Sequence, residues 1–572
     1  MARTLKWNYL LLIIIILAAF LRFFWLDRIP SAMGGDELVY ILETKSIAVS
    51  GRDLTGTWNP LTIFRFNYPP GEMQAELPYI INLPVVGLTR FSLFTARATS
   101  AFLSVFTVVG LYLLARELFN SPVAIAIGFI TAINPWEMYI GRTAYDMVPS
   151  VCFYVWGMYV MVTRKGKLFL WSLPLYILAF YSYIGTKVIF LPILFIVGLY
   201  LVKKFPHQIN KKHILIFSVT SILLVCFYLF CVFSAKNSTR ITELVHISDP
   251  VISQTVDTIR KSSIRSTFVD IYVNKYTVFS TIILTKLLKC VSFDYLFVNG
   301  DNFFSLYSHG LFYYTDAVFL ILGVLTMFAK NKRVTAFIGI LALVGIIPHL
   351  LHSVSTENFS PHIVMMIPFF LIFIGYGIHE FIYSMFPKYK RILLIVVVGV
   401  YVISLGNFLQ IYWFQNSLTG KFDFPLRVMS KYIQIQNKNH PIIVYSLRPV
   451  DVFKKYLFYG NLITDRSLSE IQRSFQTNNI QVGNVSFIRC DAKAVIPKDA
   501  TVLNDAECGA LAVNAAHLKI TRLTDGGETF SIYNDGICSG YRLKPYPSNI
   551  SIKDLDIERM NKTDFCETYI TR

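Results

Sequence analysis

The stretch ARATSAFLSVFTVVGLYLLARELF, residues 96–119, decides the fold class of this chain. It carries no charged residue between Arg97 and Arg116, and an α-helix needs about 20 predominantly apolar residues to cross a bilayer. Comparable apolar runs recur at about 7–26, 95–119, 122–140, 148–163, 168–183, 188–202, 213–233, 311–329, 334–352, 362–384 and 392–411. The repetition predicts a mainly α, polytopic membrane protein with about eleven transmembrane helices.

The composition of the whole chain agrees with this prediction. The 572 residues are 54% hydrophobic and 15% aromatic, and the mean hydropathy is +0.52. Soluble domains contain about 45–50% apolar residues even when glycine is counted. The net charge of +18 is compatible with nucleic-acid binding, but it also arises when Lys and Arg gather in cytoplasmic loops.

The positions of the basic clusters favour the second interpretation and predict an orientation. The clusters lie at 164–167, 203–212, 330–333 and 388–391, each after an even-numbered run. If the N-terminus is cytoplasmic, all of them fall on the cytoplasmic side, as the positive-inside rule requires. Residues 27–94, 141–147, 234–308 and 353–361 then form the outer loops. A cleaved signal peptide is the alternative for the first run.

The last part of the chain, residues 412–572, has the pattern of a soluble domain. Segments 441–446, 484–490 and 529–534 resemble strands, and 451–459 has helical spacing. We expect an α/β domain outside the cytoplasm, after a transmembrane domain that covers residues 1–411. Four cysteines in an oxidising compartment predict one or two disulfides whose pairing stays open: Cys490, Cys508, Cys538 and Cys566.

Two adjacent carboxylates, Asp36 and Glu37, follow a Gly-Gly step shortly after the first apolar run. A solvated turn is the simplest interpretation, because loops are rich in glycine and acidic residues. The alternative is acid–base chemistry at the membrane surface. The loop that follows is aromatic and rich in proline, with Trp58 and Tyr68, so we expect it to pack. A further outer acid, Asp146, strengthens the alternative.

Three more residues of the outer loops invite a functional interpretation. Arg142 and Asp146 are four residues apart and would share one face of a helix. They would form a salt bridge worth under about 1 kcal/mol, or bind a phosphate and a metal. Lys187 breaks the positive-inside pattern, so it anchors the interface or grips a lipid phosphate. A later group consists of His349, His352, Glu357 and His362, and its spacing favours a polar lining over a zinc site.

The sequence contains no GxxxxGK[ST] nucleotide-binding motif and no GxSxG nucleophile motif. We therefore expect any activity to use a pre-activated substrate that the protein reaches from the outer leaflet.

Several stretches, taken in order, resemble the GT-C superfamily of polytopic glycosyltransferases, in particular its protein O-mannosyltransferase and lipid A aminoarabinose transferase branch. The resemblance covers about residues 7–411. It rests on Gly35-Asp36-Glu37, Tyr68-Pro69-Pro70, residues 96–119, NPWEMYIGRTAYD (134–146) and YSYIGTKVIFLP (181–192).

The resemblance implies a reaction and a set of site residues. A polyprenyl-phosphate sugar is the donor, and the sugar moves with inversion to an acceptor hydroxyl on the outer face. The family's pattern matches Asp36 to the proposed catalytic base, Glu37 to its acidic neighbour and Asp146 to an acid near the donor phosphate or a metal. Lys187 stands where related chains often have Arg, and His362 replaces an Arg.

The chemistry of these residue types agrees with that reaction. A carboxylate helps a weak hydroxyl nucleophile by accepting its proton in the transition state. Cations near the leaving phosphate stabilise the charge that develops, and Lys187, Arg142 and Arg97 are candidates. We expect Trp58, Tyr68 and Tyr145 to line the sugar, and a divalent metal (Mg, Mn or Zn) is compatible with the resemblance.

Two other functions stay open at the level of the sequence. A transporter or flippase would carry charged groups near the centres of its spans. In this sequence the centres of the spans are nearly free of charge. A non-catalytic anchor would not need eleven spans. The acceptor can be a glycan, a lipid or a protein. The resemblance to bacterial members favours a bacterial plasma membrane.

Overall fold

The structure is a computed structural model. It describes residues 2–58, 75–163, 168–205, 208–234, 249–301, 303–306, 309–353, 355–415, 424–437, 439–477, 479–490, 496–509, 517–544 and 550–572. Of residues 2–8 and 231–234 it describes the backbone alone. The chain is mainly helical and ends in a domain built on a β-sheet, as predicted.

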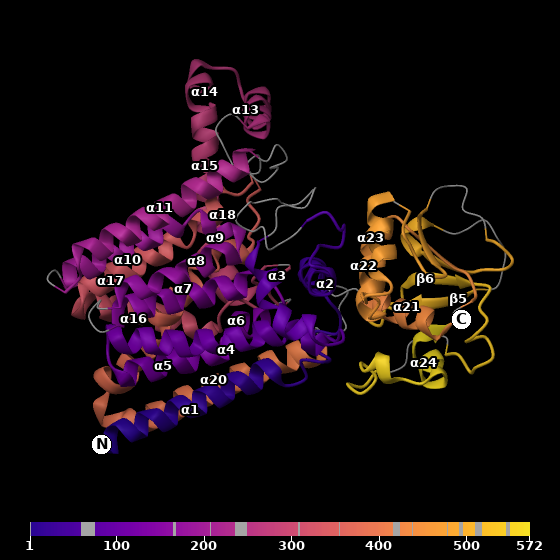
Figure 1. The fold of residues 1–572 in the computed structure, drawn as a ribbon. Helices are drawn as coiled ribbons and strands as arrows, with labels where there is room; N and C mark the ends of the chain where they lie inside the picture. Colours follow the sequence, from indigo (N-terminus) through magenta and orange to yellow (C-terminus); the bar gives the residue numbers. More distant parts are fainter. Residues whose placement is uncertain are drawn as a thin grey trace.

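The helices of the first part run lengthwise beside one another, and the C-terminal domain lies beyond one end of them (Figure 1). The bundle consists of α1 (Ala2–Phe23), α4 (Leu93–Leu118), α5 (Ser121–Ile133), α6 (Pro135–Ile140), α7 (Met147–Val162), α8 (Leu173–Ser182), α10 (Phe190–Lys204), α11 (Lys211–Ser234), α16 (Tyr314–Lys330), α17 (Lys332–Val344), α18 (Ile347–Leu351), α19 (Ile367–Glu380) and α20 (Lys390–Gln410). Helices α16 and α19 approach closely: a Cβ on Gly323 would lie 1.9 Å from the carbonyl oxygen of Phe373. Small residues permit such close crossings in membrane bundles.

Five of the described helical segments are long and apolar enough to cross a membrane. They are Leu93–Leu118, Lys211–Phe230, Lys332–Leu351, Ile367–Met385 and Pro387–Gln415. Shorter apolar helices cover Tyr9–Phe23, Ser121–Ile133, Met147–Val162 and Phe169–Ser182. The presence of apolar helices agrees with a polytopic protein, while the count of eleven spans and their orientation stay predictions.

Two expected spans are divided in the structure. The run at 122–140 ends as a helix at Ile133, and α6 begins at Pro135. Proline cannot donate a backbone hydrogen bond and favours a helix start, and the Asn134 side chain accepts from the N–H of Glu137 at 2.9 Å. The run at 334–352 is divided into α17 and α18, with Pro348 in the first turn of α18.

Short elements cover the end of the bundle that faces the C-terminal domain. These are α2 (Gly35–Ser50), α3 (Leu77–Ile81), the π-helical turn η2 (Leu83–Gly87) and α9 (Ile184–Lys187). In Figure 1, α2 and α3 lie between the bundle and the C-terminal domain. A longer excursion contains α13 (Pro250–Ser262), α14 (Thr267–Tyr272) and α15 (Lys275–Cys290). The remaining short turns are η4 (Phe169–Ser172), η5 (Asp294–Val298), η6 (Ser360–Ile363), η7 (Phe381–Met385), η8 (Pro387–Tyr389) and η9 (Ile411–Gln415).

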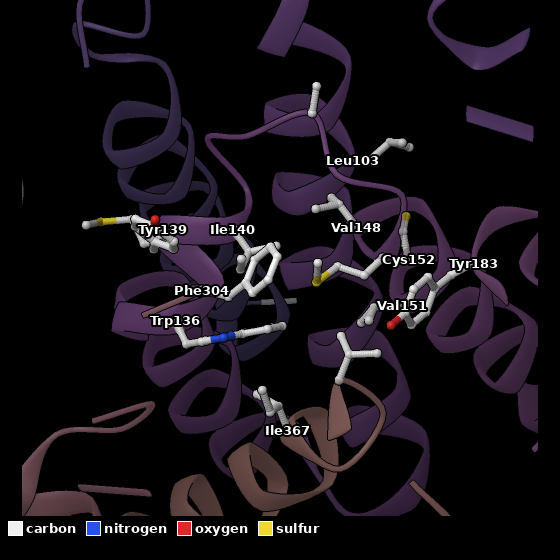
Figure 2. Close-up of a cluster of buried hydrophobic side chains, with 14 of the residues drawn as sticks. Leu103, Trp136, Tyr139, Ile140, Val148, Val151, Cys152, Tyr183, Phe304 and Ile367 are labelled. Carbon is white, nitrogen blue, oxygen red and sulfur yellow. The ribbon is translucent and has the colours of Figure 1, made fainter. Parts of the chain in front are cut away.

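A buried cluster supports the segment between α6 and α7 (Figure 2). Trp136, Tyr139 and Ile140 of α6 meet Val148 and Val151 of α7 there, and all of them are nearly inaccessible. Leu103 of α4 and Ile367 of α19 join the cluster, together with Phe304. Residues 141–147 thus connect two helices whose ends are fixed by packing, which gives this short loop a defined position.

The C-terminal domain contains one seven-stranded sheet with the order β2-β3-β1-β4-β6-β5-β7. Strand β1 pairs in parallel with β3 and β4, and the other pairs are antiparallel. The strands are β1 (Ile442–Ser446), β2 (Gln481–Val482), β3 (Val485–Arg489), β4 (Thr501–Asp505), β5 (Leu518–Thr521), β6 (Glu528–Tyr533) and β7 (Ile570–Thr571). The helices are α21 (Phe424–Ile435), α22 (Pro449–Tyr459), α23 (Leu468–Thr477), α24 (Lys562–Tyr569) and the turns η12 (Ala506–Cys508) and η13 (Ile557–Arg559).

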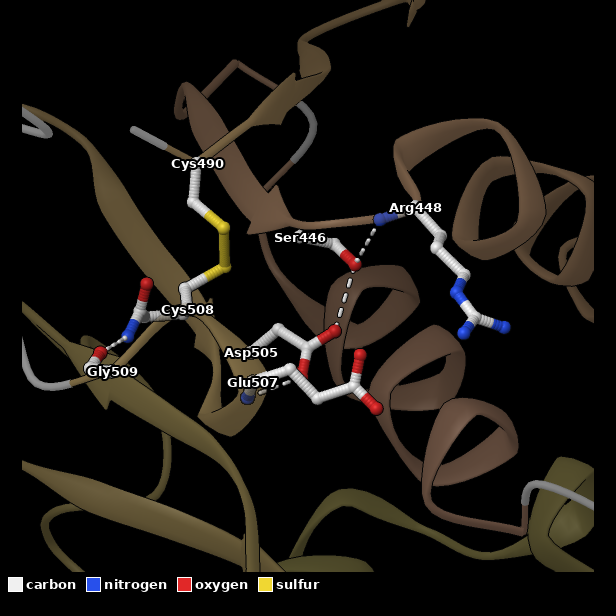
Figure 3. Close-up of a disulfide and its surroundings, with 8 residues drawn as sticks. Ser446, Arg448, Cys490, Asp505, Glu507, Cys508 and Gly509 are labelled. Carbon is white, nitrogen blue, oxygen red and sulfur yellow. Dashed lines mark hydrogen bonds between the residues drawn. A yellow bond between two sulfur atoms is a disulfide. The ribbon is translucent and has the colours of Figure 1, made fainter. Parts of the chain in front are cut away.

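Two disulfides join parts of this domain, Cys490–Cys508 and Cys538–Cys566. The first connects the residue after β3 with the turn after β4 (Figure 3). Beside it, the hydroxyl of Ser446 donates to Asp505 at 2.7 Å. Both bonds are compatible with an oxidising compartment, as the sequence predicts.

We expect the double variant Cys538→Ser/Cys566→Ser to lose about 2–4 kcal/mol of stability, because the buried bond closes a loop and restricts the unfolded chain. Thermal unfolding of the full-length protein, followed by the circular dichroism of the sheet, measures the change. Cys226→Ser, at an exposed free thiol, is the matched control. Equal melting temperatures for the double variant and wild type would contradict the expectation.

Candidate active site

Glu37 lies at the centre of a buried polar network. Its carboxylate accepts from Arg97 Nε at 2.8 Å, from the backbone N–H of Ala144 at 3.0 Å and from the N–H of Gly34 at 2.9 Å. The side chains of Glu37 and Arg97 are both fully buried. This network joins α2, α4 and the loop 141–147. The network occupies the carboxylate of Glu37 within the protein, and a catalytic role of Glu37 stays a prediction.

Asp36 precedes Glu37 in the first turn of α2 and is exposed to solvent. It lies close enough to Tyr145 for its charge to act on the phenol. Burial, and then the charges of Glu37 and Asp36, raise the pKa of Tyr145. Tyr145 therefore stays a neutral hydrogen-bond donor and acceptor over the physiological pH range. The structure thus brings Asp36 beside Tyr145 and leaves its carboxylate accessible.

Asp146 follows Tyr145 in the chain, is half-buried and accepts from the hydroxyl of Tyr40 at 2.7 Å. The backbone N–H of Ala75 donates to the same hydroxyl at 3.3 Å. Burial, and then the charge of Asp146, raise the pKa of Tyr40 well above its usual value. Tyr40 therefore remains a donor that orients the carboxylate of Asp146.

The position of Gly34 shows how closely these segments approach. A Cβ at residue 34 would lie 2.4 Å from the hydroxyl oxygen of Tyr145. No side chain fits there unless Tyr145 moves. The Gly-Gly step before Asp36 thus permits the contact between the start of α2 and the loop 141–147, in addition to forming a turn.

Lys187 forms a second buried ion pair, with Glu76. Its Nζ donates to the two carboxylate oxygens at 2.9 and 2.8 Å. The ammonium also lies 4.1 Å from the ring centroid of Tyr228, which favours a cation. The ring of Tyr79 lies 5.2 Å from that of Tyr40, which bonds Asp146, and the charges of both Glu76 and Asp146 act on Tyr79. The pair is therefore close to the acidic site, but Lys187 already has a carboxylate partner.

Arg142 is fully buried and donates to backbone carbonyls at the end of the first helix. Its acceptors include the oxygens of Leu21 (2.9 Å), Arg22 (3.1 Å) and Ile29 (2.9 Å), and the hydroxyl of Tyr412 at 3.2 Å. These acceptors belong to the first helix, the segment that follows it and η9. Phosphate binding by Arg142 stays a prediction, and its contacts here are those of a buried connector.

A row of aromatic rings connects His362 to the site. Tyr145 contacts Phe304 with ring centroids 4.9 Å apart, and Phe304 contacts Phe359 at 5.1 Å. Phe359 contacts His362 at 4.6 Å, and His362 contacts His352 at 4.3 Å. Asp301 links the segment around residue 303 to the segment around residue 360, because it accepts from the N–H groups of Phe303, at 2.8 Å, and Ser360, at 2.9 Å. His362 is thus on the same side of the bundle as Tyr145, several side chains away.

Trp58 lies beneath the site. It is 6% exposed and packs with Tyr40 and Tyr79, and its ring centroid is 5.4 Å from that of Tyr79. In this position it supports the two tyrosines, and contact with a sugar stays a prediction. Tyr68 lies outside the described residues.

The site contains both carboxylates and cations. Asp36, Glu37, Glu76 and Asp146 contribute carboxylates, whereas Arg97 and Lys187 are the cations that meet them. Arg97 is paired with Glu37, and Lys187 is paired with Glu76. Sequence reasoning missed Glu76 and Tyr40, because neither stands in a motif and only the fold places them against Lys187 and Asp146.

The carboxylates of the site bear on the metal that the resemblance suggests. No three His, Cys, Asp or Glu side chains gather as a ligand set among the residues that the structure describes. Mg²⁺ nevertheless binds through one or two carboxylates together with substrate phosphates. Asp146, with Asp36 nearby, fits that kind of partial oxygen ligand set.

A third acid of α2, Glu43, gives a testable pH dependence. Burial raises its pKa to about 8, although the N–H of Leu54 donates to it at 2.8 Å. The folded protein then binds a proton that the unfolded chain releases above its ordinary pKa near 4.5. Stability should fall as pH rises between these two values and level off above about 8.

We therefore expect Glu43→Gln to lose this part of the pH dependence, since Gln keeps an acceptor for Leu54 and cannot ionise. Melting temperatures of the variant and of wild type between pH 5 and pH 9 measure the effect. Parallel curves would show that Glu43 titrates alike in the folded and unfolded states.

The comparisons with known proteins find structures but no sequence relatives. No protein-family model matches the sequence, and no curated protein matches it. Among solved structures, the chain is similar to an oligosaccharyltransferase of Archaeoglobus fulgidus in complex with Zn and sulfate, at 12% identity. That alignment covers 92% of this chain and 73% of the other, with a TM-score of 0.43.

The chain is also similar to ArnT from Cupriavidus metallidurans. The apo structure is 11% identical, with 93% of this chain and 98% of that chain covered and a TM-score of 0.45. The structure with undecaprenyl phosphate is 10% identical, with 91% and 97% covered and a TM-score of 0.47. At these sequence identities and TM-scores, no role of a residue in the solved structures is transferred to a residue of this chain.

Proposed function

We propose that this protein is a membrane glycosyltransferase that moves a sugar from a polyprenyl-phosphate donor to an acceptor hydroxyl on the outer face, with inversion. One observation carries the proposal, at one end of an apolar helical bundle: Asp36 is exposed in the first turn of α2, two residues after Gly34, whose backbone lies against the hydroxyl of Tyr145. Asp146 accepts from Tyr40 of the same helix. A buried ion pair directly behind Asp36, Glu37 with Arg97, keeps this end of α2 in place. We propose a bacterial plasma membrane as the location.

In the proposed mechanism, Asp36 is the general base. The acceptor oxygen attacks the anomeric carbon from the face opposite the phosphate, and its proton passes to Asp36 as the new C–O bond forms. The old bond from the anomeric carbon to the phosphate oxygen breaks, and the polyprenyl phosphate leaves with the electron pair. A positioned base of this kind contributes about 10²–10⁴-fold to a rate. Attack opposite the leaving group inverts the anomeric centre.

Asp146 and Lys187 act on the other half of the reaction. Tyr40 orients Asp146, which can bind a sugar hydroxyl or a divalent cation. A divalent cation bound there would neutralise charge on the leaving phosphate. Lys187 contributes positive charge from its pair with Glu76, and Tyr145 can hydrogen-bond the sugar between the two acids. The undecaprenyl phosphate of the ArnT structure belongs to the class of the proposed leaving group, a polyprenyl phosphate without its sugar.

The experiment that tests the proposal is sugar transfer by the purified full-length protein in lipid nanodiscs. Polyprenyl-phosphate hexoses and pentoses with a radiolabelled sugar serve as donors, and glycan, lipid and peptide hydroxyls serve as acceptors. We expect label to appear in an acceptor with release of polyprenyl phosphate. Movement of intact donor across sealed vesicles, without covalent change, would favour a flippase instead.

A further inference from the structure

The segment that leads into α2 is held in an unusual way. Residues 29–33, here called the linker, join the end of the first helix to the turn before Asp36. All five of its carbonyl oxygens accept hydrogen bonds from buried cationic side chains. The pairs are Ile29 with Arg142 (2.9 Å), Pro30 with Arg97 (2.6 Å), Ser31 with Arg427 (2.6 Å), Ala32 with Arg97 (2.6 Å) and Met33 with Lys455.

The cations come from two different parts of the protein. Arg97 and Arg142 belong to the bundle, whereas Arg427 lies on α21 and Lys455 on α22 of the C-terminal domain. The hydroxyl of Tyr459, also on α22, accepts from the N–H of Met33 at 2.9 Å. Both backbone groups of Met33 are therefore bonded to the C-terminal domain.

The side chains from the C-terminal domain are themselves well held. Arg427 and Lys455 are 2% and 3% exposed. Glu558 accepts from Arg427 Nε at 2.8 Å, so the planar guanidinium has one fixed direction and presents its remaining N–H groups to the linker. Further contacts continue past α2, where the side chain of Gln472 donates to the carbonyl of Asp53 at 3.1 Å.

These contacts bear on the geometry of Asp36. Only Gly34 and Gly35 separate the linker from Asp36, and glycines do not restrict the backbone by themselves. The direction of the Asp36 carboxylate thus depends on where the linker ends. Arg97 donates both to the linker and to Glu37. The helical bundle and the C-terminal domain therefore both bind the few residues that precede Asp36.

We propose that Arg427 and Lys455 are positioning residues, through which the C-terminal domain holds Asp36 in its reactive direction. The catalytic unit then includes the C-terminal domain, which would contribute to turnover even if it never touches the sugar. The inference rests on the proposed function for the role of Asp36, but the contact itself can be tested without it.

The test compares Lys455→Met with wild type and with Lys519→Met in the full-length protein in nanodiscs. Lys519 lies on β5, where it pairs with Glu528, and has no contact with the linker, so this control removes the same charge from the same domain. Amide hydrogen exchange of residues 31–40 is the first readout, and we expect it to be faster only in Lys455→Met.

The second readout is transfer kinetics. A displacement of about 1 Å at a reacting group can cost about 10²-fold, so kcat should fall by about 10- to 100-fold. The KM for the donor should change little.

Further variants keep the test decisive. Lys455→Arg should restore part of kcat, because it can still donate to the carbonyl of Met33. If Lys455→Met does not fold, Tyr459→Phe removes only the acceptor of the Met33 N–H and should raise exchange at residue 33 itself.

Unchanged exchange in both variants would overturn the proposed holding of the linker. Faster exchange with an unchanged kcat would overturn its role in positioning. If wild type transfers no sugar, the proposed function fails, while the exchange data still decide whether the domain holds the linker.

Discussion

Asp36→Asn is expected to reduce sugar transfer by about 10²–10⁴-fold while the protein keeps its fold. Asn has nearly the same size as Asp and can still accept a hydrogen bond, but it cannot take a proton from the acceptor hydroxyl. The side chain is exposed at the start of α2, so the change leaves no buried charge without a partner. The measurement is kcat with a polyprenyl-phosphate sugar donor, together with the melting temperature and the affinity for the donor.

The matched control is Asp270→Asn, an exposed acid on α14, away from the site, which should keep wild-type activity. If Asp36→Asn turns over like wild type, then Asp36 is not the base, and the half-buried Asp146 becomes the next candidate. If transfer is lost together with the fold, the comparison of melting temperatures reveals it.

Glu37→Gln is expected to be the most destabilising single change in this region. It leaves the fully buried guanidinium of Arg97 without its carboxylate. Removal of one partner of a buried ion pair costs about 3–5 kcal/mol, because the remaining charge stays away from water. The free energy of unfolding in detergent, measured by denaturant titration followed by Trp fluorescence, gives the size of the loss.

A double variant and a surface pair complete this test. Glu37→Gln/Arg97→Met should be clearly less destabilised than the sum of its two single variants, since no unpaired charge remains. Asp525→Asn breaks the exposed pair with Arg522 and should cost much less, because water screens the charges of that pair. If Glu37→Gln costs as little as Asp525→Asn, the carboxylate of Glu37 does not hold α2 in the way that the structure indicates.

Much of the architecture could be predicted from local patterns. Apolar runs of about 20 residues predict membrane-length helices because the thickness of a bilayer sets that length. The alternating segments near residues 442, 485 and 528 are strands of one sheet, as expected. Strands β4 and β5, and the two-residue strands β2 and β7, escaped prediction because pairing with neighbours, more than sequence pattern, defines them.

The roles of the cations show where such reasoning stops. Arg97, Arg142 and Lys187 were predicted to bind phosphate because positive charge near a membrane exit suggests it. In the structure, Arg97 pairs with Glu37, Arg142 binds backbone carbonyls and Lys187 pairs with Glu76. A charged residue takes its partner from the fold, and the partners here are 60 and 111 residues away from Arg97 and Lys187.

The sequence by itself determined that this is a helical membrane protein with a separate C-terminal domain, and it singled out Asp36 and Asp146 as acids near the membrane. Those conclusions follow from patterns within short windows, because helix length, strand alternation and loop composition are local properties. Only the tertiary structure decided that Asp36 is accessible beside Tyr145, that Glu37 is buried, and that Arg427 and Lys455 reach the linker from the other domain. The last two contacts join residues that are 396 and 422 positions apart, and no local pattern records which buried charge meets which carbonyl.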